Sequence, residues 1–147
     1  MRPGVDRLFV DANVLFSAAY KPNSHLLGLW HLLEAEIVAS ELAFEEARRN
    51  LAACRPDRLA LLDELCQRVA VAPEAEGLPP ALDDVELPDK DRPILAAAIA
   101  AGCTHLLTGD RRHFGRLYGR RVAGVLILTP REYFGQSSAA RGRRQKR

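Results

Sequence analysis

Short apolar runs alternate with helical patterns along this chain, and this alternation is the feature that most limits its fold. Runs typical of β-strands occur at Leu8–Val10, Glu36–Ala39, Val69–Val71, Thr104–Thr108 and Val125–Leu128. Strands that alternate with helices at this spacing predict a parallel sheet covered by helices on both faces. The sequence therefore predicts an α/β fold of three layers, α/β/α, around a central parallel sheet of about five strands.

Helical patterns fill the segments between these runs. We expect helices over Val14–Tyr20, Glu41–Ala53 and Pro130–Phe134, one capped by Ser24 and one opened by Pro56. The segment 73–88 contains four prolines and is expected to be a loop. It is not expected to be a linker between domains, because the regular pattern resumes after it.

The charge of the chain is divided unevenly. The last seven residues, RGRRQKR, hold five of the 21 basic side chains, so residues 1–140 carry 16 basic and 19 acidic residues, a net charge of −3. A length of 147 residues is typical of a single domain. We expect that domain over residues 1–135, followed by a basic, disordered tail over 136–147. A block of basic charge attracts phosphate backbones, and it can equally serve as a solubilising terminus.

Nothing in the sequence predicts a membrane segment or a disulfide framework. The longest apolar run, Ile94–Ala101, is far shorter than the roughly 20 residues of a membrane span. The N-terminus lacks the apolar stretch of a signal peptide. Cys54, Cys66 and Cys103 are odd in number and form no C-x-x-C pair. We therefore expect a cytoplasmic protein without disulfides or a structural zinc site.

Two of the predicted strands end in an aspartate. Leu8–Val10 leads to Asp11, and the run Leu106–Gly109 leads to Asp110. In parallel sheets, ligands gather at the carboxyl ends of the strands. Aspartate also commonly starts loops and caps helices, so either residue alone would be ordinary. Together they predict two carboxylates at one edge of the sheet.

A further pair of aspartates opens the apolar helix expected from Asp89 to Ala101. Asp89 is the better candidate for the N-cap, because it leaves Pro93 within the first turn, where no backbone N–H is needed. Asp91 would then project from the first turn instead of acting as the cap. Both residues can also simply complement the helix dipole, and for Asp91 this alternative stays open.

The helix expected from Glu41 adds a glutamate to the candidates. Glu46 shares its face with Leu42 and Ala43, which predicts a buried position, whereas Glu45 lies on the solvated face. A glutamate on a buried apolar face must be paired, protonated or bound to a metal. Glu46 is therefore the candidate for function.

Converging carboxylates repel one another, by about 1 kcal/mol for two unit charges 4 Å apart in water and about 4 kcal/mol at an effective dielectric near 20. A divalent cation removes this conflict. Oxygen ligands suit Mg²⁺ or Mn²⁺, whereas zinc prefers His and Cys. Such a site can activate water and stabilise an in-line phosphoryl displacement.

The segments VDANV, EEARRNL, DKDRPILAAAIAAG and THLLTGDRRHF, in this order and spacing, resemble the PIN-domain ribonucleases. They are most similar to the VapC-like toxins of bacterial toxin–antitoxin pairs. The resemblance runs from about Leu8 to Phe134. It implies a PIN-like fold and a metal-dependent endoribonuclease that hydrolyses phosphodiester bonds in RNA with Mg²⁺ or Mn²⁺. It also implies an antitoxin protein as a partner and is compatible with a homodimer.

The resemblance also implies roles for single residues. The metal-binding acids of the family match four residues, and its supporting polar side chains match two. The former are Asp11, Glu46, Asp91 and Asp110, and the latter are Asn13 and Thr108. Some relatives carry a further acid shortly after the last aspartate, where this chain has residues 111–114, RRHF. The resemblance therefore leaves open whether the site holds one metal ion or two.

Two other functions stay open from the sequence. One is a PIN-fold module with weak catalysis that binds RNA or protein, which the missing acid and the basic tail favour. The other is a phosphatase that forms an aspartyl phosphate on Asp11, although such enzymes usually have a second aspartate where this chain has Asn13. For His113 a structural or surface role is favoured over contact with substrate. Arg111 and Arg112 either hold phosphate or are surface charges.

Overall fold

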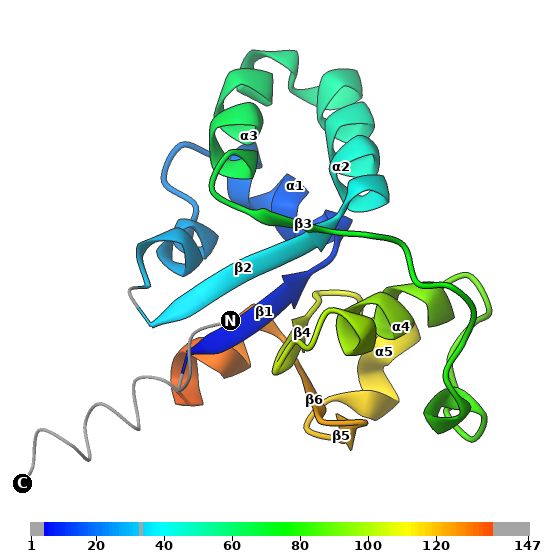
Figure 1. Ribbon diagram of the computed structural model, residues 1–147. Helices are drawn as coiled ribbons and strands as arrows, with labels where there is room; N and C mark the ends of the chain where they lie inside the picture. The colour runs from blue at the N-terminus through cyan, green and yellow to red at the C-terminus, as the bar shows by residue number, and fades with distance from the viewer. Residues whose placement is uncertain (1–4, 33, 137–147) are drawn as a thin grey trace, which may run out of the picture.

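The computed structural model describes residues 5–32 and 34–136, which form one mostly parallel sheet between two layers of helices (Figure 1). Within these residues the strands are β1 (Asp6–Val10), β2 (Ala35–Ser40), β3 (Ala70–Ala72), β4 (His105–Leu107), β5 (Arg121–Val122) and β6 (Val125–Leu128). The α-helices are α1 (Ala12–Tyr20), α2 (Glu41–Cys54), α3 (Leu59–Cys66), α4 (Arg92–Ala100) and α5 (Arg111–Phe114), and residues 130–136 are also helical. The 3₁₀ helices are η1 (His25–His31), η2 (Pro56–Arg58), η3 (Pro80–Leu82) and η4 (Gly115–Leu117).

The order of the strands in the sheet is β3-β2-β1-β4-β6-β5. All neighbouring strands are parallel except β5, which runs antiparallel to β6. Phe9 of β1 pairs with Val38 of β2 on one side and with Leu106 of β4 on the other. The adjacency of β1 and β4 confirms that the two strands that lead to Asp11 and Asp110 end side by side.

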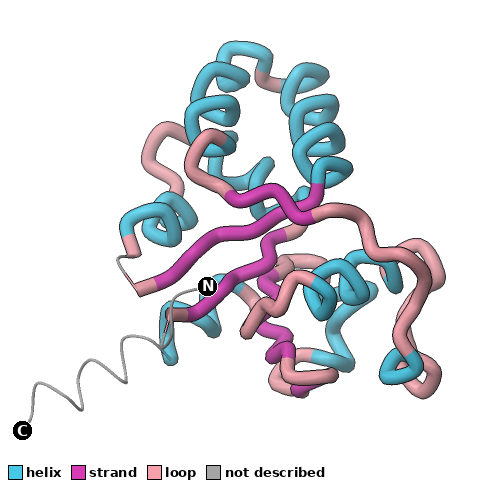
Figure 2. The backbone as a smooth tube through the Cα atoms, in the orientation of Figure 1, coloured by secondary structure: helices cyan, strands magenta, loops and turns pink. Residues whose placement is uncertain are grey.

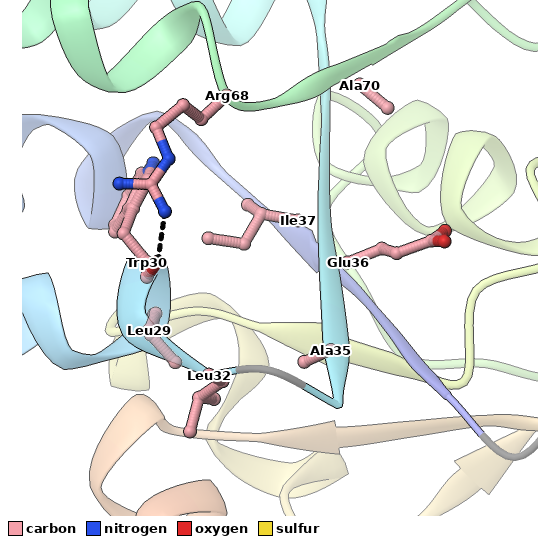
Figure 3. Close-up of a pocket in the computed structure, with 8 residues that line it drawn as sticks. All are labelled: Leu29, Trp30, Leu32, Ala35, Glu36, Ile37, Arg68 and Ala70. Carbon is pink, nitrogen blue, oxygen red and sulfur yellow. Dashed lines mark hydrogen bonds between the residues drawn. The ribbon is translucent and has the colours of Figure 1, made fainter. Parts of the chain in front are cut away.

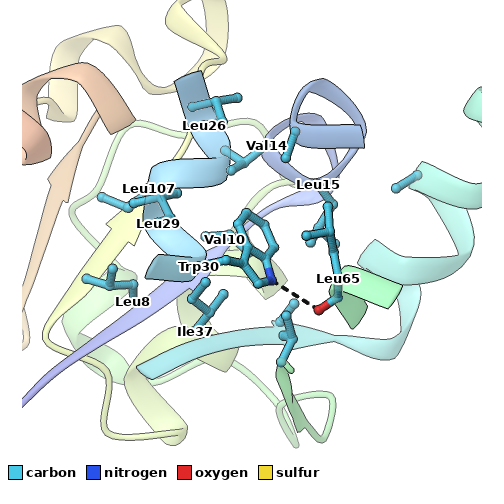
Figure 4. Packing of buried hydrophobic residues seen from close by; sticks show 14 of the residues in the cluster. Leu8, Val10, Val14, Leu15, Leu26, Leu29, Trp30, Ile37, Leu65 and Leu107 are labelled. Carbon is cyan, nitrogen blue, oxygen red and sulfur yellow. Dashed lines mark hydrogen bonds between the residues drawn. The ribbon is translucent and has the colours of Figure 1, made fainter. Parts of the chain in front are cut away.

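Alternation along the strands produces two hydrophobic cores. Leu8 and Val10 of β1 face the core formed with α1, α2, α3 and η1, whereas Phe9 faces the core formed with α4, α5 and the loop before α4. Trp30 packs in the first core, and its indole Nε1 donates to the carbonyl oxygen of Leu65 at 3.0 Å (Figure 4). This arrangement confirms the predicted three-layer α/β/α fold.

The sheet contains one strand more than predicted. β5 is only two residues long and is joined to β6 by a two-residue loop, in which Ala123 has a φ of 49° and Gly124 a φ of 88°. Two positive φ values are characteristic of a type I′ hairpin turn, which usually has Asn-Gly or Asp-Gly at these positions. With alanine at the first position, the turn has no strong signature in the sequence.

Helix α4 begins two residues later than predicted. Asp91, not Asp89, occupies the N-cap position, and the Asp91 side chain accepts no capping hydrogen bond. The Asp89 side chain is fully exposed, with an oxygen 3.3 Å from Arg92 Nε. The prediction of Asp89 as the N-cap was therefore wrong, yet the Asp91 carboxylate is free of capping as predicted. The helix ends before Gly102, which has a φ of 67°.

The predicted loop over residues 73–88 is confirmed, and it contains the short helix η3 (Figure 2). Leu82 and Leu87 of this loop are buried in the second core. Arg92 donates to the backbone carbonyls of Leu82 at 2.7 Å and Val85 at 2.9 Å. The loop is thus packed onto the domain and does not separate two domains.

The C-terminal tail and a membrane segment are the two remaining expectations about the chain. The predicted basic tail lies outside the described residues, apart from residue 136. Among the described residues, no helix combines the length and the apolar character that crossing a membrane requires.

Helix α2 offers a matched test of the first core. We expect Leu51→Ala to lower the free energy of unfolding by about 2–5 kcal/mol, because Leu51 is fully buried and its truncation leaves a cavity. Leu42→Ala on the same helix should change it by less than about 0.5 kcal/mol, because Leu42 is 59% exposed. Urea denaturation measures both values. Equal decreases would contradict the assignment of the buried face of α2.

Candidate functional site

The candidate site lies at the carboxyl ends of β1 and β4. Asp11 follows β1 directly and is the N-cap of α1, where its Oδ1 accepts from the backbone N–H of Val14 at 3.4 Å. Asp110 follows β4 after two residues and is the N-cap of α5, where its Oδ1 accepts from the backbone N–H of His113 at 3.1 Å. Each carboxylate is thus held by a hydrogen bond from the first turn of the helix that its residue caps.

Asp11 is almost completely withdrawn from water, with 6% of its surface exposed. The pKa of its carboxyl is raised to about 7, mainly because burial disfavours the charged form and in part because Asp110 lies nearby. Hydrogen bonds that the carboxyl accepts act in the opposite direction. A buried carboxylate of this kind gains stability from a nearby cation.

Asn13 and Thr108 connect the two strand ends. Asn13 Nδ2 donates to Asp11 Oδ2 at 2.9 Å and to Thr108 Oγ1 at 3.4 Å, while its Oδ1 accepts from the backbone N–H of Gly109 at 3.0 Å. The Thr108 hydroxyl is fully buried and also accepts from the backbone N–H of Asp110 at 3.1 Å. The two predicted supporting residues therefore lie where they can orient the carboxylates.

Asp91, from the start of α4, joins Asp110 through His113. His113 Nδ1 lies 2.8 Å from Asp110 Oδ2 and 3.2 Å from Asp91 Oδ2. Ligand atoms of these three residues all lie within 4.8 Å of one another, a spacing suitable for one metal ion. His113 was not among the predicted site residues. Its place in the sequence, one helical turn after Asp110, was the only signal that pointed to it.

The Asp91 carboxylate is the least satisfied group of the site. Only 7% of Asp91 is exposed, and its Oδ2 atom is buried without a hydrogen bond despite the short distance to His113. A single ring N–H serves one acceptor, and Asp110 Oδ2 is nearer to His113 Nδ1 than Asp91 Oδ2 is. A buried acceptor without a donor is costly, and a cation would satisfy it. The residues therefore fit a divalent metal ion bound by carboxylate oxygens.

Glu46 reaches the same cleft for a reason other than the predicted one. The face of α2 that carries Glu46 is exposed, and Leu42 on that face is 59% exposed. The buried face carries Ala43, Ala47 and Leu51 instead. The prediction of a buried glutamate was therefore wrong, because the small side chains of α2, not its leucine at position 42, pack against α1 and α3. Glu46 instead lines the wall of the cleft.

All four predicted acids line one open cleft of about 490 Å³, which we call the acidic cleft. Its walls come from α1, α2, α4 and α5. The lining residues are Asp11, Ala12, Asn13, Phe16, Glu46, Asn50, Ala53, Cys54, Lys90, Asp91, Ile94, Asp110 and His113. The cleft is open and mixed in polarity, so it can admit part of a polymer next to a bound cation.

Another pocket, of about 400 Å³, lies at the opposite edge of the sheet, where β2 and β3 begin (Figure 3). Arg68 Nη2 donates to the carbonyl oxygen of Trp30 at 2.7 Å. Glu36 points to the other face of β2 and pairs with Arg7 at 2.8 Å. The charged groups here are already engaged in structural contacts, so the acidic cleft is the better candidate for chemistry.

The raised pKa of Asp11 predicts a specific pH dependence of stability without metal. Between the unfolded value of 3.8 and the folded value of about 7, the folded state keeps a proton that the unfolded state has released. Stability therefore falls as the pH rises through this range, by about 2–3 kcal/mol between pH 5 and pH 8. We expect Asp11→Asn to remove this decrease in the free energy of unfolding, as measured by denaturation in EDTA at pH 5 and pH 8.

The control for this measurement is Asp83→Asn, which changes an exposed carboxylate on the loop before α4. It should keep the pH dependence of the unaltered protein. A pH dependence in Asp11→Asn that equals that of the control would show that Asp11 is charged at pH 5 and is not desolvated.

Comparison with known proteins identifies the family and supports the fold. A family model described as PIN domain matches residues 7–112. No curated protein matches the sequence. The fold is similar to a chain in the crystal structure of VapBC2 from Rickettsia felis bound to a DNA fragment from their promoter. That match has a TM-score of 0.59 and 15% sequence identity, and it covers 84% of this chain and 98% of that chain. The family match covers well over half of the sequence, and the chain therefore belongs to the PIN domain family, a family of nucleases.

Proposed function

We propose that this protein is a metal-dependent endoribonuclease that hydrolyses phosphodiester bonds of RNA in the acidic cleft. The observation that carries the proposal is the meeting of Asp11, Asp91 and Asp110 in one open cleft, together with the buried Asp91 oxygen that lacks a hydrogen bond. Mg²⁺ or Mn²⁺ is the proposed cation, because both are bound by carboxylate oxygens.

In this proposal Asp11, Asp91 and Asp110 hold the cation, and Glu46 contributes from the opposite wall of the cleft. When bound, the cation supplies charge neutralisation at the phosphodiester and activation of water for in-line displacement at phosphorus. Asn13 keeps the Asp11 carboxylate in place through its 2.9 Å hydrogen bond. Such supporting contacts aim the ligands and strengthen metal binding.

We also propose that the protein is the toxin of a toxin–antitoxin pair. The support is the family, the similarity of its fold to a chain of a VapBC2 complex, and an open cleft that a partner can cover. The expected outcome is that the product of the adjacent reading frame co-purifies with this chain and stops its RNA cleavage. A cleavage rate that the co-purified product leaves unchanged would contradict the pairing.

The nuclease proposal predicts opposite results for two neighbouring aspartates. We expect Asp91→Asn to lower metal-dependent cleavage of single-stranded RNA at least about a hundredfold. Loss of a supporting residue already costs about 10–100-fold, and a direct ligand should cost no less. Asp89→Asn should keep nearly full activity, because Asp89 is fully exposed and makes only a surface ion pair. Single-turnover cleavage with Mg²⁺ or Mn²⁺ measures both.

Two controls make this experiment decisive. EDTA should abolish cleavage by the unaltered protein, and Mn²⁺ should raise its thermal midpoint, since a ligand of the folded state stabilises it. Cleavage that persists in EDTA, or in purified Asp91→Asn, contradicts the proposal. Absence of both cleavage and Mn²⁺ binding would favour the alternative of a binding module with the same fold.

A further inference from the structure

A second, smaller cleft lies beside the acidic cleft, and we call it the basic cleft. Its volume is about 190 Å³. It is lined by Asn13, Val14, Ser17, His25, Leu26, Gly109, Arg111, Thr129, Pro130 and Arg131. Pockets that enclose a whole small ligand usually measure about 300–1,000 Å³. The basic cleft is therefore suited to one part of a longer molecule.

The two clefts meet at Asn13, and we call this boundary the ridge. Asn13 lines both of them, while the next turn of α1 places Phe16 in the acidic cleft and Ser17 in the basic cleft. The turn after β4 divides in the same way, since Asp110 lines the acidic cleft and Arg111 lines the basic cleft. A chain molecule that crosses this ridge contacts both clefts at once.

The charges on the two sides of the ridge are opposite. Four carboxylates line the acidic cleft, whereas Arg111 and Arg131 line the basic cleft without any carboxylate. Both arginines are exposed, and within residues 5–32 and 34–136 neither side chain forms an ion pair or hydrogen bond. Ser17 and His25 add polar groups to the lining of this cleft. This cleft has the donors that recognise a phosphate group.

The geometry points to a phosphate subsite: we propose that the basic cleft binds a backbone phosphate of the RNA strand next to the phosphodiester that is cleaved. This inference rests on the proposed nuclease function. Arginine presents a planar set of donors that matches phosphate oxygens, and phosphate contacts fix the register of a strand on a protein. Arg111 and Arg131 thereby determine which phosphodiester lies in the acidic cleft.

The test compares two double variants that remove the same charge. Arg111→Gln/Arg131→Gln alters the basic cleft. Arg120→Gln/Arg121→Gln alters arginines at the start of β5, which line neither cleft. Both are made in the Asp91→Asn background, in which cleavage is expected to be at least about a hundredfold slower. A short, labelled, mixed-sequence single-stranded RNA is the probe. Fluorescence anisotropy in Mg²⁺ at several salt concentrations gives the affinity and its salt dependence.

We expect the basic-cleft variant to bind the RNA about tenfold more weakly than the control. The slope of log affinity against log salt should fall by about 0.7 for each phosphate that the variant no longer binds. Arg111→Lys/Arg131→Lys keeps the charge and should recover most of the affinity. In the catalytically active background, KM should rise while kcat stays close to that of the control. The thermal midpoint should not change, because both side chains are exposed.

The failures of the two proposals are distinguishable. If the unaltered protein cleaves RNA but the basic-cleft variant binds and cleaves like the control, the phosphate subsite is refuted and the nuclease proposal stands. If RNA binds with the predicted dependence on the two arginines but no metal-dependent cleavage occurs, the subsite stands and the nuclease proposal is refuted. If the RNA does not bind to the Asp91→Asn protein with both arginines intact, the phosphate subsite is refuted.

Discussion

The site depends on the electrostatic cost of holding carboxylates together where water is largely excluded. Asp11 and Asp110 are brought close because β1 and β4 are neighbours in a parallel sheet, and α4 adds Asp91. Like charges at short range disfavour ionisation, and burial adds to this effect. Asn13 holds the Asp11 carboxylate, and Thr108 holds the backbone of Asp110, despite that cost. The fold thus holds in place carboxylates whose mutual repulsion a cation would relieve.

Much of the fold and part of the site could be predicted from the sequence, because the signals were local. A parallel strand that ends in aspartate puts its carboxylate at a known edge of the sheet, and this pattern alone was enough to locate Asp11 and Asp110. Pro93 indicated where α4 begins to within two residues. The roles of these acids in metal binding and catalysis remain predictions.

What could not be predicted depended on tertiary packing. The exposed face of α2 was predicted to be buried. Ala43 and Ala47 form the buried face of this helix instead, so Leu42 points to solvent. β5 was missed because Ala123 adopts a backbone conformation that its side chain disfavours. The proximity of His113 to Asp91 was not predicted because it depends on how α4 and α5 lie relative to each other, which no spacing within one segment reveals.

The two outer strands of the sheet are short. β3 has three residues and is followed at once by Pro73, and β5 has two residues and ends in the tight hairpin turn. Short edges expose few unpaired backbone groups, and a proline beside them cannot donate a hydrogen bond. The sheet therefore offers little template for edge-to-edge aggregation.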